Sequence, residues 1–472
     1  MKIKYSIGSL CFTLFGLGAC LDDQSSLGNR ELSEITISAP HDTLTAYFGE
    51  EFVVSHLSVE QSGEELPLAY EWSYGTLNTD EDGMASYPIK DSLHIVSHDP
   101  ELKYAFRELG TFGLRLRVDN GETIRYKYFV LQVDTEFSEG ITILSRDGDG
   151  KGRISFMRTL TKEEINTGKV PVFRTDIMEL INPGTKMEDV TDMVQVNNRL
   201  LVCSGDAGRI YNMDSRTFDI EGMTSFKELY PGCAFVKFAG VSANNNIYLV
   251  SRDRRGYVYD YVLDELMLTE YFKDLDVDAA VSVDRPVFVN YETSVFYSPS
   301  LGGVTSSLNR YVDFNIWGIC AVGSSVYVMA TYKVMPSYIY LSQTTFSLGN
   351  PTILQFYDSP VSLKVNRNSL FAGSKSYSCL YYTCEDGIYY WDLKKQLSTT
   401  PVISIPVGME ITSLSMNPDG TLLYVGLHEK EGTEALKGHL YVYDVKTSTL
   451  ISQYHNCLLY TSPSPRDAHE SR

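Results

Sequence analysis

The sequence has few of the residues on which hydrolytic and metal-dependent enzymes rely. Between residues 140 and 456 it contains only three histidines, His428, His439 and His455, and neither HExxH nor GxSxG. No CxxC pair occurs in the chain. These absences exclude the zinc-protease and serine-hydrolase motifs and a paired-cysteine metal site. Carboxylates are plentiful, but the sequence alone assigns no pair of them to a shared catalytic site.

Positive charge is also scarce. The 472 residues include 40 Lys and Arg against 60 Asp and Glu, for a net charge of -20, and no basic cluster is dense enough to overturn that balance. Nucleic acid is therefore excluded as a partner. What the sequence does have is 33 Tyr and 21 Phe, with Gly and Pro between short apolar runs. This composition predicts a mostly β globular protein of two or more domains.

The N-terminus has the pattern of a targeting segment. Lys2 and Lys4 precede an apolar run over 7–17, and the tetrapeptide LGAC ends at Cys20. The tetrapeptide resembles the bacterial lipobox, which implies a signal peptide over 1–19 and lipidation of Cys20. A secretory signal with a chance cysteine and a buried helix are the alternatives. The anchor would be the only contact with the membrane.

The residues after Cys20 form a short acidic linker over 20–33. Asp22 and Asp23 in LDDQSS resemble the export signal of surface lipoproteins in Bacteroidota, which implies an outer-membrane lipoprotein exposed at the cell surface. A solvated linker is the alternative. At the other end, residues 457–472 resemble the translation of a sequencing adapter. We therefore expect that this tail is not native and that the natural sequence continues differently after Asn456.

Residues 34–135 show short strand-like runs bounded by turn formers, which predicts a β-sandwich. Tyr70 and Trp72 alternate to one face of LAYEWSYG, so Trp72 is expected in the core. Phe112, Leu114, Leu116 and Val118 share one face of a second strand, which ends at the turn signal DNG. These two strands resemble the PKD domain, an immunoglobulin-like module. The order of lipobox, module and C-terminal repeats resembles the PKD-like family lipoproteins of Bacteroidota.

Residues 140–456 repeat. A strand led by Gly or Ser recurs seven times, as GRIS, GRIY, GYVY, SVFY, SYIY, GIYY and GHLY starting at 152, 208, 256, 294, 337, 387 and 438. Spacings of roughly 40 to 50 residues with several short strands in each are typical of β-propeller blades. The predicted fold is all-β, with an Ig/PKD-like sandwich followed by a seven-bladed propeller.

A hairpin precedes each of the last six repeats, but the first repeat begins directly at its second strand. Propellers commonly complete one blade with strands from both ends of the chain. We therefore predict that the inner strand of blade one belongs after Asn456. With a foreign tail there, the propeller would be truncated at its closing strand.

The stretch SRDGDGKGRI at 145–154 has the composition of either a calcium loop or a tight turn. Asp147 and Asp149 are weak metal-ligand candidates, because Lys151 occupies the next alternate position. A hairpin turn equivalent to DRRG in blade three is the favoured interpretation. No cofactor is expected, and calcium is not favoured.

Candidate ligand residues lie in the loops that follow the second strands. The segment SYSCLYYTCEDG carries Tyr377, Tyr381 and Tyr382, and a disulfide between Cys379 and Cys384 could pin it. The alternative is that CLYYT is itself a strand that packs between blades. Arg254 and Arg255 could bind an anionic ligand or could lie in a solvated turn. Trp317 and Trp391 are expected in the core.

The family resemblance implies a lipid-anchored binding protein at the cell surface. Such proteins accompany SusC/SusD-like, TonB-dependent nutrient uptake, so the expected partners are an outer-membrane transporter or its lipoproteins. The propeller face would bind a glycan, a peptide or a partner protein. A pure scaffold of the outer-membrane complex and a propeller hydrolase or lyase that acts on an extracellular polymer are the alternatives.

Overall fold

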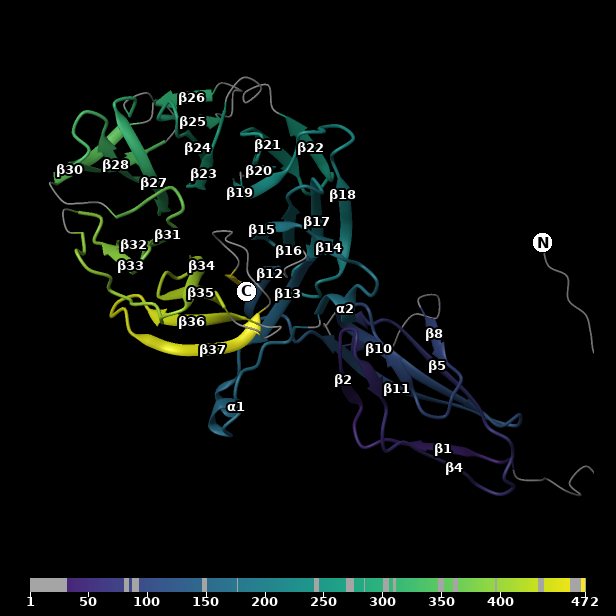
Figure 1. Ribbon diagram of the computed structural model, residues 1–472. Coiled ribbons are helices and arrows are strands. Elements are labelled where there is room, and N and C mark those ends of the chain that lie inside the picture. Colours follow the sequence, from purple (N-terminus) through teal and green to yellow (C-terminus); the bar gives the residue numbers. More distant parts are fainter. Residues whose placement is uncertain are drawn as a thin grey trace, which may run out of the picture. The chain divides into compact units, whose positions relative to one another are not determined.

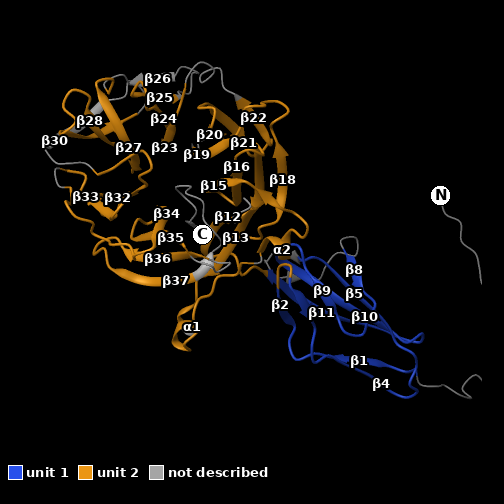
Figure 2. Cartoon of the chain, in the orientation of Figure 1, with its two compact units in different colours: residues 1–46, 50–133 blue, residues 47–49, 134–472 orange. Residues whose placement is uncertain are grey.

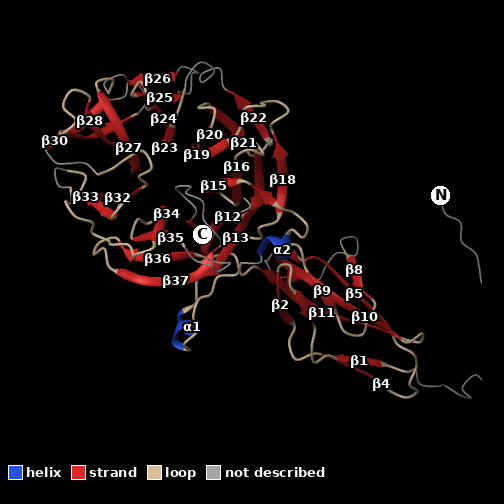
Figure 3. Cartoon of the chain, in the orientation of Figure 1, coloured by secondary structure: helices blue, strands red, loops and turns tan. Residues whose placement is uncertain are grey.

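The computed structural model describes most of the chain between Leu32 and Leu458 and a short strand near its end. The described residues are 32–79, 85–86, 93–146, 151–175, 177–241, 246–268, 276–283, 285–299, 305–308, 311–346, 352–359, 364–394, 397–431, 437–458 and 468–471. Strands dominate, as Figures 1 and 3 show. The chain divides into two compact units, residues 1–46 with 50–133 and residues 47–49 with 134–472 (Figure 2).

The predicted signal peptide, Cys20 and the acidic residues after it lie outside the described residues. Within the part of the chain that the structure covers, no helix is both long and apolar enough to cross a membrane.

The first unit is a β-sandwich. Its five-stranded sheet has the order β2-β11-β10-β5-β8, formed by β2 (Thr43–Tyr47), β11 (Ile124–Asp134), β10 (Gly110–Asp119), β5 (Ala69–Thr76) and β8 (His94–Ser97). The remaining strands pair as β1 (Ile35–Ser38) with β4 (Ser58–Gln61), β3 (Glu51–Val53) with β9 (Lys103–Ala105), and β6 (Asn78–Thr79) with β7 (Ala85–Ser86).

The core of this unit confirms the alternation seen in the sequence. Trp72 is fully buried and stacks on Phe129, with ring centroids 6.1 Å apart. Its indole N–H donates to the carbonyl of Asp99 at 3.1 Å, so the polar atom of this core residue is satisfied. Leu114, Leu116 and Val118 of β10 are also fully buried on the same face. Burial of these side chains is what specifies the register of the central strands.

The second unit is a seven-bladed propeller, which confirms the predicted fold class. Figure 1 shows its sheets arranged around an axis. Five blades have four described strands in sequence order. Blade two consists of β15 (Val190–Val196), β16 (Arg199–Ser204), β17 (Arg209–Asp214) and β18 (Ile220–Ser225). Blade three consists of β19 (Phe235–Val241), β20 (Asn246–Ser251), β21 (Gly256–Asp260) and β22 (Glu265–Leu268). Blade four consists of β23 (Ala279–Ser282), β24 (Pro286–Asn290), β25 (Val295–Pro299) and β26 (Thr305–Leu308). Blade five consists of β27 (Phe314–Val322), β28 (Ser325–Tyr332), β29 (Ile339–Thr345) and β30 (Thr352–Ser359). Blade seven consists of β34 (Met409–Met416), β35 (Leu422–Glu429), β36 (Gly438–Asp444) and β37 (Leu450–Leu458).

Blade six has three described strands, β31 (Phe371–Ser374), β32 (Cys379–Cys384) and β33 (Gly387–Trp391). Isolated bridges from Ile388 to Ile403 and from Trp391 to Leu397 take the place of an outer strand. The hairpin expected in SLKVNRNSLFAGS is wrong by one strand. Its second half forms the inner strand β31, and the tyrosine-rich segment after it forms the second strand.

Blade one is made from both ends of the propeller segment. Its order is β14-β13-β12-β38, with β12 (Gly140–Arg146), β13 (Lys151–Arg158), β14 (Met187–Glu188) and β38 (Ala468–Ser471). The inner strand β38 pairs antiparallel with β12 and also contacts β34 and β15. Each inner strand likewise contacts the next, so the ring of seven is closed.

This closure corrects one expectation and leaves another as a prediction. The inner strand of blade one does come from the C-terminal end, but blade one is not open, because residues 468–471 fill the position. That residues 457–472 are foreign to the natural protein stays a prediction of the sequence.

The first blade also carries an insertion between its third and fourth strands. It contains two short helices, α1 (Lys162–Asn166) and α2 (Ile177–Ile181). The chain between them returns to the sheet, where Arg174 and Phe156 exchange backbone hydrogen bonds. Phe173 then packs edge-on against Tyr454 of blade seven, with ring centroids 5.7 Å apart. The insertion therefore covers part of the junction between the first and last blades.

Candidate functional site

The direction of the strands fixes which loops share a side of the propeller. Inner strands begin, and second strands end, on one side, which we call the upper face. The turns between first and second strands lie on the opposite side, the lower face. Arg254 and Arg255 follow β20 on the upper face, whereas Tyr377 lies in the turn between β31 and β32 on the lower face. The predicted ligand residues are therefore not brought together.

Tyr381 and Tyr382 are not ligand residues in this structure, which corrects the loop prediction. Both lie in β32 with 0% and 3% of their surface exposed. The Tyr381 hydroxyl donates to the carbonyl of Val445 at 2.8 Å, and burial raises its pKa to about 12. Tyr382 stacks between Phe371 and Tyr389, with centroid distances of 6.2 and 5.6 Å. The alternative interpretation, a strand packed between blades, is the right one.

The predicted disulfide is also wrong. Cys379 and Cys384 are free thiols at the two ends of β32. Residues five apart in a strand point to opposite faces, so Cys379 packs toward blade seven and Cys384 toward blade five. Burial raises their pKa values to about 11 and about 12, so both stay protonated at neutral pH.

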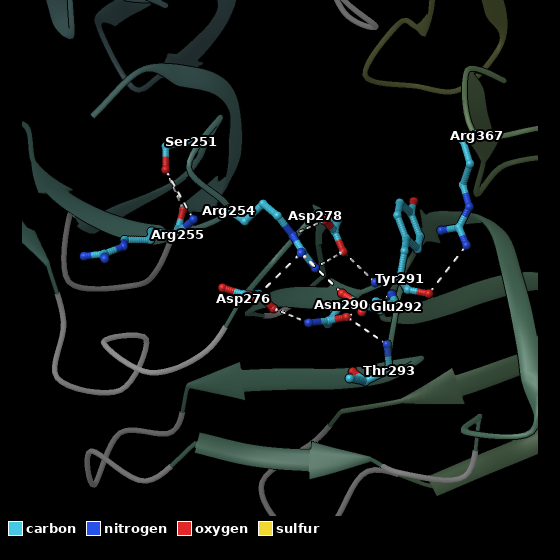
Figure 4. A network of polar contacts seen from close by, with 10 residues as sticks. All are labelled: Ser251, Arg254, Arg255, Asp276, Asp278, Asn290, Tyr291, Glu292, Thr293 and Arg367. Carbon is cyan, nitrogen blue, oxygen red and sulfur yellow. Dashed lines mark hydrogen bonds and ion pairs between the residues drawn. The ribbon is translucent and has the colours of Figure 1, made fainter. Parts of the chain in front are cut away.

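Arg254 is held by carboxylates rather than presented to solvent (Figure 4). Its guanidinium donates to Asp278 through Nε at 2.7 Å and through Nη2 at 3.2 Å. Asp276 and Glu292 lie 3.6 and 3.5 Å from Nη1. These contacts raise the pKa of Arg254 and neutralise its charge. Arg254 therefore does not serve as a free anion site.

The same network positions Tyr291 at the start of the next turn. Asp278 accepts the backbone N–H of Tyr291 at 2.7 Å, with the oxygen that also faces Nη2 of Arg254. Asn290 accepts the backbone N–H groups of Glu292 and Thr293, each at 2.9 Å, and so closes the turn after β24. Figure 4 shows how these contacts tie the turns of blades three and four together. Arg254 is thus a positioning residue.

The remaining predicted site residues are Arg255, Tyr377, Asp147 and Asp149. The guanidinium of Arg255 lies 3.6 Å from the carboxylate of Asp253 in its own turn. Tyr377 is 39% exposed and stands apart from the other two tyrosines. Asp147 and Asp149 lie outside the described residues, so the choice between a turn and a metal site stays a prediction. Among the residues that the structure describes, no group of three or more metal ligands is close enough to hold an ion.

A hollow of about 510 Å³ opens on the upper face near the axis. Its wall combines residues from the beginnings of inner strands with residues that follow second strands, in blades three to seven. The lining residues are Val236, Lys237, Val250, Asp278, Ala279, Ala280, Tyr291, Trp317, Ile319, Arg367, Asn368, Ser369, Leu370, Phe371, Glu410 and Ile411. We call it the axial hollow. Its size lies in the range of small-ligand sites.

Bulges in the inner strands shape this wall. The register of β27 against β28 shifts between Ile316 and Gly318, which leaves Trp317 outside the regular pairing. A bulge re-aims a side chain, and here Trp317 lines the hollow, only partly buried, instead of lying in the core as predicted. The register shifts likewise at Val236 in β19 and at Thr412 in β34. Trp391, by contrast, is a core residue as expected, with 1% exposed.

Gly318 is required at the bulge because Phe371 of blade six packs directly over it. A Cβ atom at this position would lie 1.9 Å from Cζ of Phe371. The absence of a side chain therefore lets the inner strands of blades five and six approach closely beneath the hollow.

Arg367 is the most exposed cation of the rim and was missed from the sequence. Its guanidinium carbon lies 4.0 Å from the centroid of the Tyr291 ring and 5.6 Å from that of Trp317. Its one hydrogen bond within the described structure is a long one, from Nη2 to the carbonyl of Tyr291 at 3.5 Å. No described carboxylate pairs with it. The walls of the hollow remove part of its hydration, which lowers its pKa, while Tyr291 and Asp278 act in the opposite direction.

Two further hollows help to place the axial one. A hollow of about 470 Å³ on the upper face shares Asn368, Ser369, Glu410 and Ile411 with it. The two therefore adjoin along blades six and seven. A hollow of about 680 Å³ lies on the lower face, lined by turns of blades five to seven such as 321–323 and 417–421.

The histidines of blade seven form a separate cluster. Nδ1 of His439 lies 3.1 Å from Nδ1 of His455, and Nε2 of His439 lies 3.2 Å from the Glu429 carboxylate. Burial lowers the pKa of His439, and the neighbouring His455 lowers it further, while Glu429 opposes both. His439 is 2% exposed, so this cluster is part of the interior and not of the upper-face hollows.

Comparison with known proteins gives similarity of structure only. No protein family and no curated protein matches this sequence. A quinonprotein alcohol dehydrogenase-like protein from Bacteroides thetaiotaomicron is similar with a TM-score of 0.49 and 12% identity, over 94% of this chain and 99% of that chain. The β-propeller domain of Cps50 (Swd1) from Myceliophteria thermophila is similar with a TM-score of 0.41 and 10% identity, over 57% of this chain and 86% of that chain. The computationally designed Ika8 protein is similar with a TM-score of 0.41 and 16% identity, over 69% of this chain and 90% of that chain.

Proposed function

We propose that this chain is a binding protein that presents the upper face of its propeller to a ligand. The observation that supports this role best is Arg367, an exposed cation over two aromatic rings with no described carboxylate partner. A folded protein gains little stability from such an arrangement, whereas an incoming anionic group would gain a preorganised partner. The shared rim with the second hollow extends the surface available to a ligand.

We further propose that the protein is anchored by lipid at Cys20 and displayed on the outer membrane. The LGAC motif and the aspartates that follow it support this location. The resemblance of residues 34–135 and of the whole arrangement to PKD-like lipoproteins supports an accessory role in SusC/SusD-like nutrient uptake. In this proposal the first unit is a spacer, and the propeller captures a glycan, a peptide or a partner protein.

The anchor and the partners can be tested with the complete gene product, tagged at its C-terminus and expressed in its own host. Labelled fatty acid should be incorporated into the wild type and not into a Cys20→Ala variant, and only the wild type should sediment with the outer membrane. Capture from detergent-solubilised outer membrane should recover a transporter and its lipoprotein in stoichiometric amounts. A wild type that is neither labelled nor membrane-bound would overturn the anchor, and a capture with nothing above background would overturn the uptake complex.

The binding role has its own test, which does not depend on the location. A soluble form that begins after Cys20 is passed over immobilised extracellular polymers, neutral and acidic, and the Arg367→Ala variant is compared with the wild type. Retention of the wild type alone supports the proposal. If no polymer or peptide pool is retained by the wild type, the propeller is a scaffold instead.

A further inference from the structure

We propose that the axial hollow binds a saccharide that carries a carboxylate, with the acid group held by the guanidinium of Arg367. A uronic acid unit is the simplest ligand of this class. The inference rests on the proposed binding function and names the substrate class of that same site.

The geometry around Arg367 favours a carboxylate. The cation–π contact with Tyr291, whose ring centroid lies 4.0 Å from the guanidinium carbon, holds the guanidinium at the hollow, and its N–H groups lie at the edge of the guanidinium plane. Only one of them has a described acceptor, at the long distance of 3.5 Å. A planar guanidinium with free parallel N–H groups matches the two oxygens of a carboxylate, and its placement at the hollow reduces the entropy lost on binding.

Neither of the described acids that line the hollow is in a position to take this role. Asp278 lines the same hollow, but its two oxygens accept from Arg254 at 2.7 and 3.2 Å and from the backbone of Tyr291 at 2.7 Å. Glu410 also lines the hollow and forms no described ion pair with Arg367. Within the described part of the chain, the place of an anionic partner beside Arg367 is left to a ligand.

The rest of the wall favours a ligand with a single acid group and several hydroxyls. Glu410 and Asp278 would repel a run of carboxylates, such as an acidic peptide carries, but each can accept a hydrogen bond from a hydroxyl. The side-chain amide of Asn368 forms no hydrogen bond with a described residue and can serve hydroxyls as donor and acceptor. Trp317, Ile319 and Phe371 supply apolar surface for the C–H face of a sugar ring.

The adjoining hollow gives room for more than one sugar unit. Asn368, Ser369 and Glu410 line both hollows, so a chain bound in the axial hollow could continue across this shared rim toward Lys430 and Glu385. An oligosaccharide should consequently bind more tightly than its monomer, because each hollow would contribute contacts without a second loss of rigid-body freedom.

The test uses the soluble protein that begins after Cys20 and titration calorimetry with defined trisaccharides. The probes are trisaccharides with one acid group each, namely neutral disaccharides that end in one glucuronate or one galacturonate unit, and the methyl ester of each is the matched neutral ligand. We expect at least one acidic trimer to bind and its neutral ester to bind about 10- to 100-fold more weakly, which is the range expected for loss of a charge-assisted pair.

Three variants locate the binding. Arg367→Ala should weaken the acidic trimer about 10- to 100-fold and leave any weak binding of the neutral ester unchanged. Arg367→Lys keeps the charge and loses the planar fork, so it should recover only part of the affinity. Arg255→Ala is the matched control, an exposed arginine of the same face that already has Asp253 beside it, and should bind like the wild type.

The outcomes separate this inference from the binding function itself. Binding of neutral saccharides that is lost in Arg367→Ala would overturn the acidic ligand and keep the proposed function. Binding of an acidic peptide or a free amino acid in place of the trimers would overturn the saccharide class. Acidic trimers that bind wild type and Arg367→Ala equally, or that do not bind at all, would overturn the assignment of this hollow.

Discussion

Blade six contributes two contrasting regions to the propeller. In β32, all six residues from Cys379 to Cys384 are buried, and the hydroxyl of Tyr381 is bonded within the protein. In the segment just before β31, Arg367 and Asn368 are exposed, and their polar groups make few contacts with described residues. The first region holds two blades together, while the second faces a hollow.

The contrast shows where binding groups can be found in this fold. Most aromatic residues of the strands pack between blades, because their large apolar surfaces are what the sheets bury against each other. Trp317, at its bulge, and Phe371 are strand residues that also line the hollow. The polar groups available to a ligand lie in the segments that lead into the inner strands. Arg254 is intermediate, since it lies on the same face as Arg367 but its charge is neutralised by three carboxylates.

The largest effect should come from the buried region. Tyr381→Ala removes a fully buried ring and should lower the free energy of unfolding by about 3–5 kcal/mol, the usual cost of such a cavity. Tyr377→Ala, at the exposed turn of the same blade, should stay within about 0.5 kcal/mol. Urea unfolding of both variants measures the difference. Equal costs would contradict the contrast between the buried strand and the exposed segments of blade six.

Next in size is the contact beneath the hollow. Gly318→Ala places a Cβ 1.9 Å from the Phe371 ring and should cost about 1–3 kcal/mol through overpacking. Gly222→Ala is the control, because its Cβ would have no neighbour nearer than 3.5 Å. Thermal unfolding reports the change in stability, and the intrinsic tryptophan fluorescence, to which Trp317 next to Gly318 contributes, reports the change at the bulge. A Gly318→Ala variant as stable as Gly222→Ala would show that blades five and six are not closely packed there.

The positioning role of Arg254 predicts a smaller effect that reaches the hollow. Arg254→Ala leaves Asp278 without its bidentate partner and should cost about 1 kcal/mol, since a third of the arginine side chain is exposed to solvent. Ligand affinity should also decrease, because Asp278 holds the turn that carries Tyr291. If stability decreases while affinity does not, the network supports the blades but does not position the rim.

The smallest expected effect is a dependence of stability on pH in blade seven. The pKa of buried His439 lies below its ordinary value of 6.5, so the unfolded chain binds more protons than the folded one just below that pH. Stability should therefore be complete above about pH 6.5 and decline as the pH falls through the lowered pKa. His439→Gln should flatten the decline in unfolding midpoints measured between pH 7.5 and 5.5, and an unchanged decline would assign it to other groups.

Much of the propeller could be predicted because each blade repeats one short signal. The seven tetrapeptides led by Gly or Ser all fall at the third strand of a blade, from GRIS in β13 to GHLY in β36. The prediction for blade six was wrong by one strand. The segment CLYYTC is rich in tyrosine and bounded by turn formers, and such a segment can form a loop as well as a strand. Only its packing on both faces decides between them.

The site was harder to predict because it depends on partners from other blades. Nothing in the sequence around Arg254 shows that Asp278 and Glu292 surround it, and nothing around Arg367 shows that Tyr291 and Trp317 lie beneath it. The bulge at Trp317 gave one local signal, the adjacent Gly318 within a strand, which often marks an irregularity or a close approach.

The wall of the axial hollow is shared among blades three to seven, which has a consequence for motion. A molecule bound there touches several inner strands at once, whereas each described inner strand contacts its immediate neighbours in the ring. Opening of any one of these blades would then break ligand contacts as well as its own, so occupancy should slow amide hydrogen exchange in β19, β23, β27, β31 and β34 together. Blades one and two, which contribute nothing to the wall, would keep the exchange rates of the free protein.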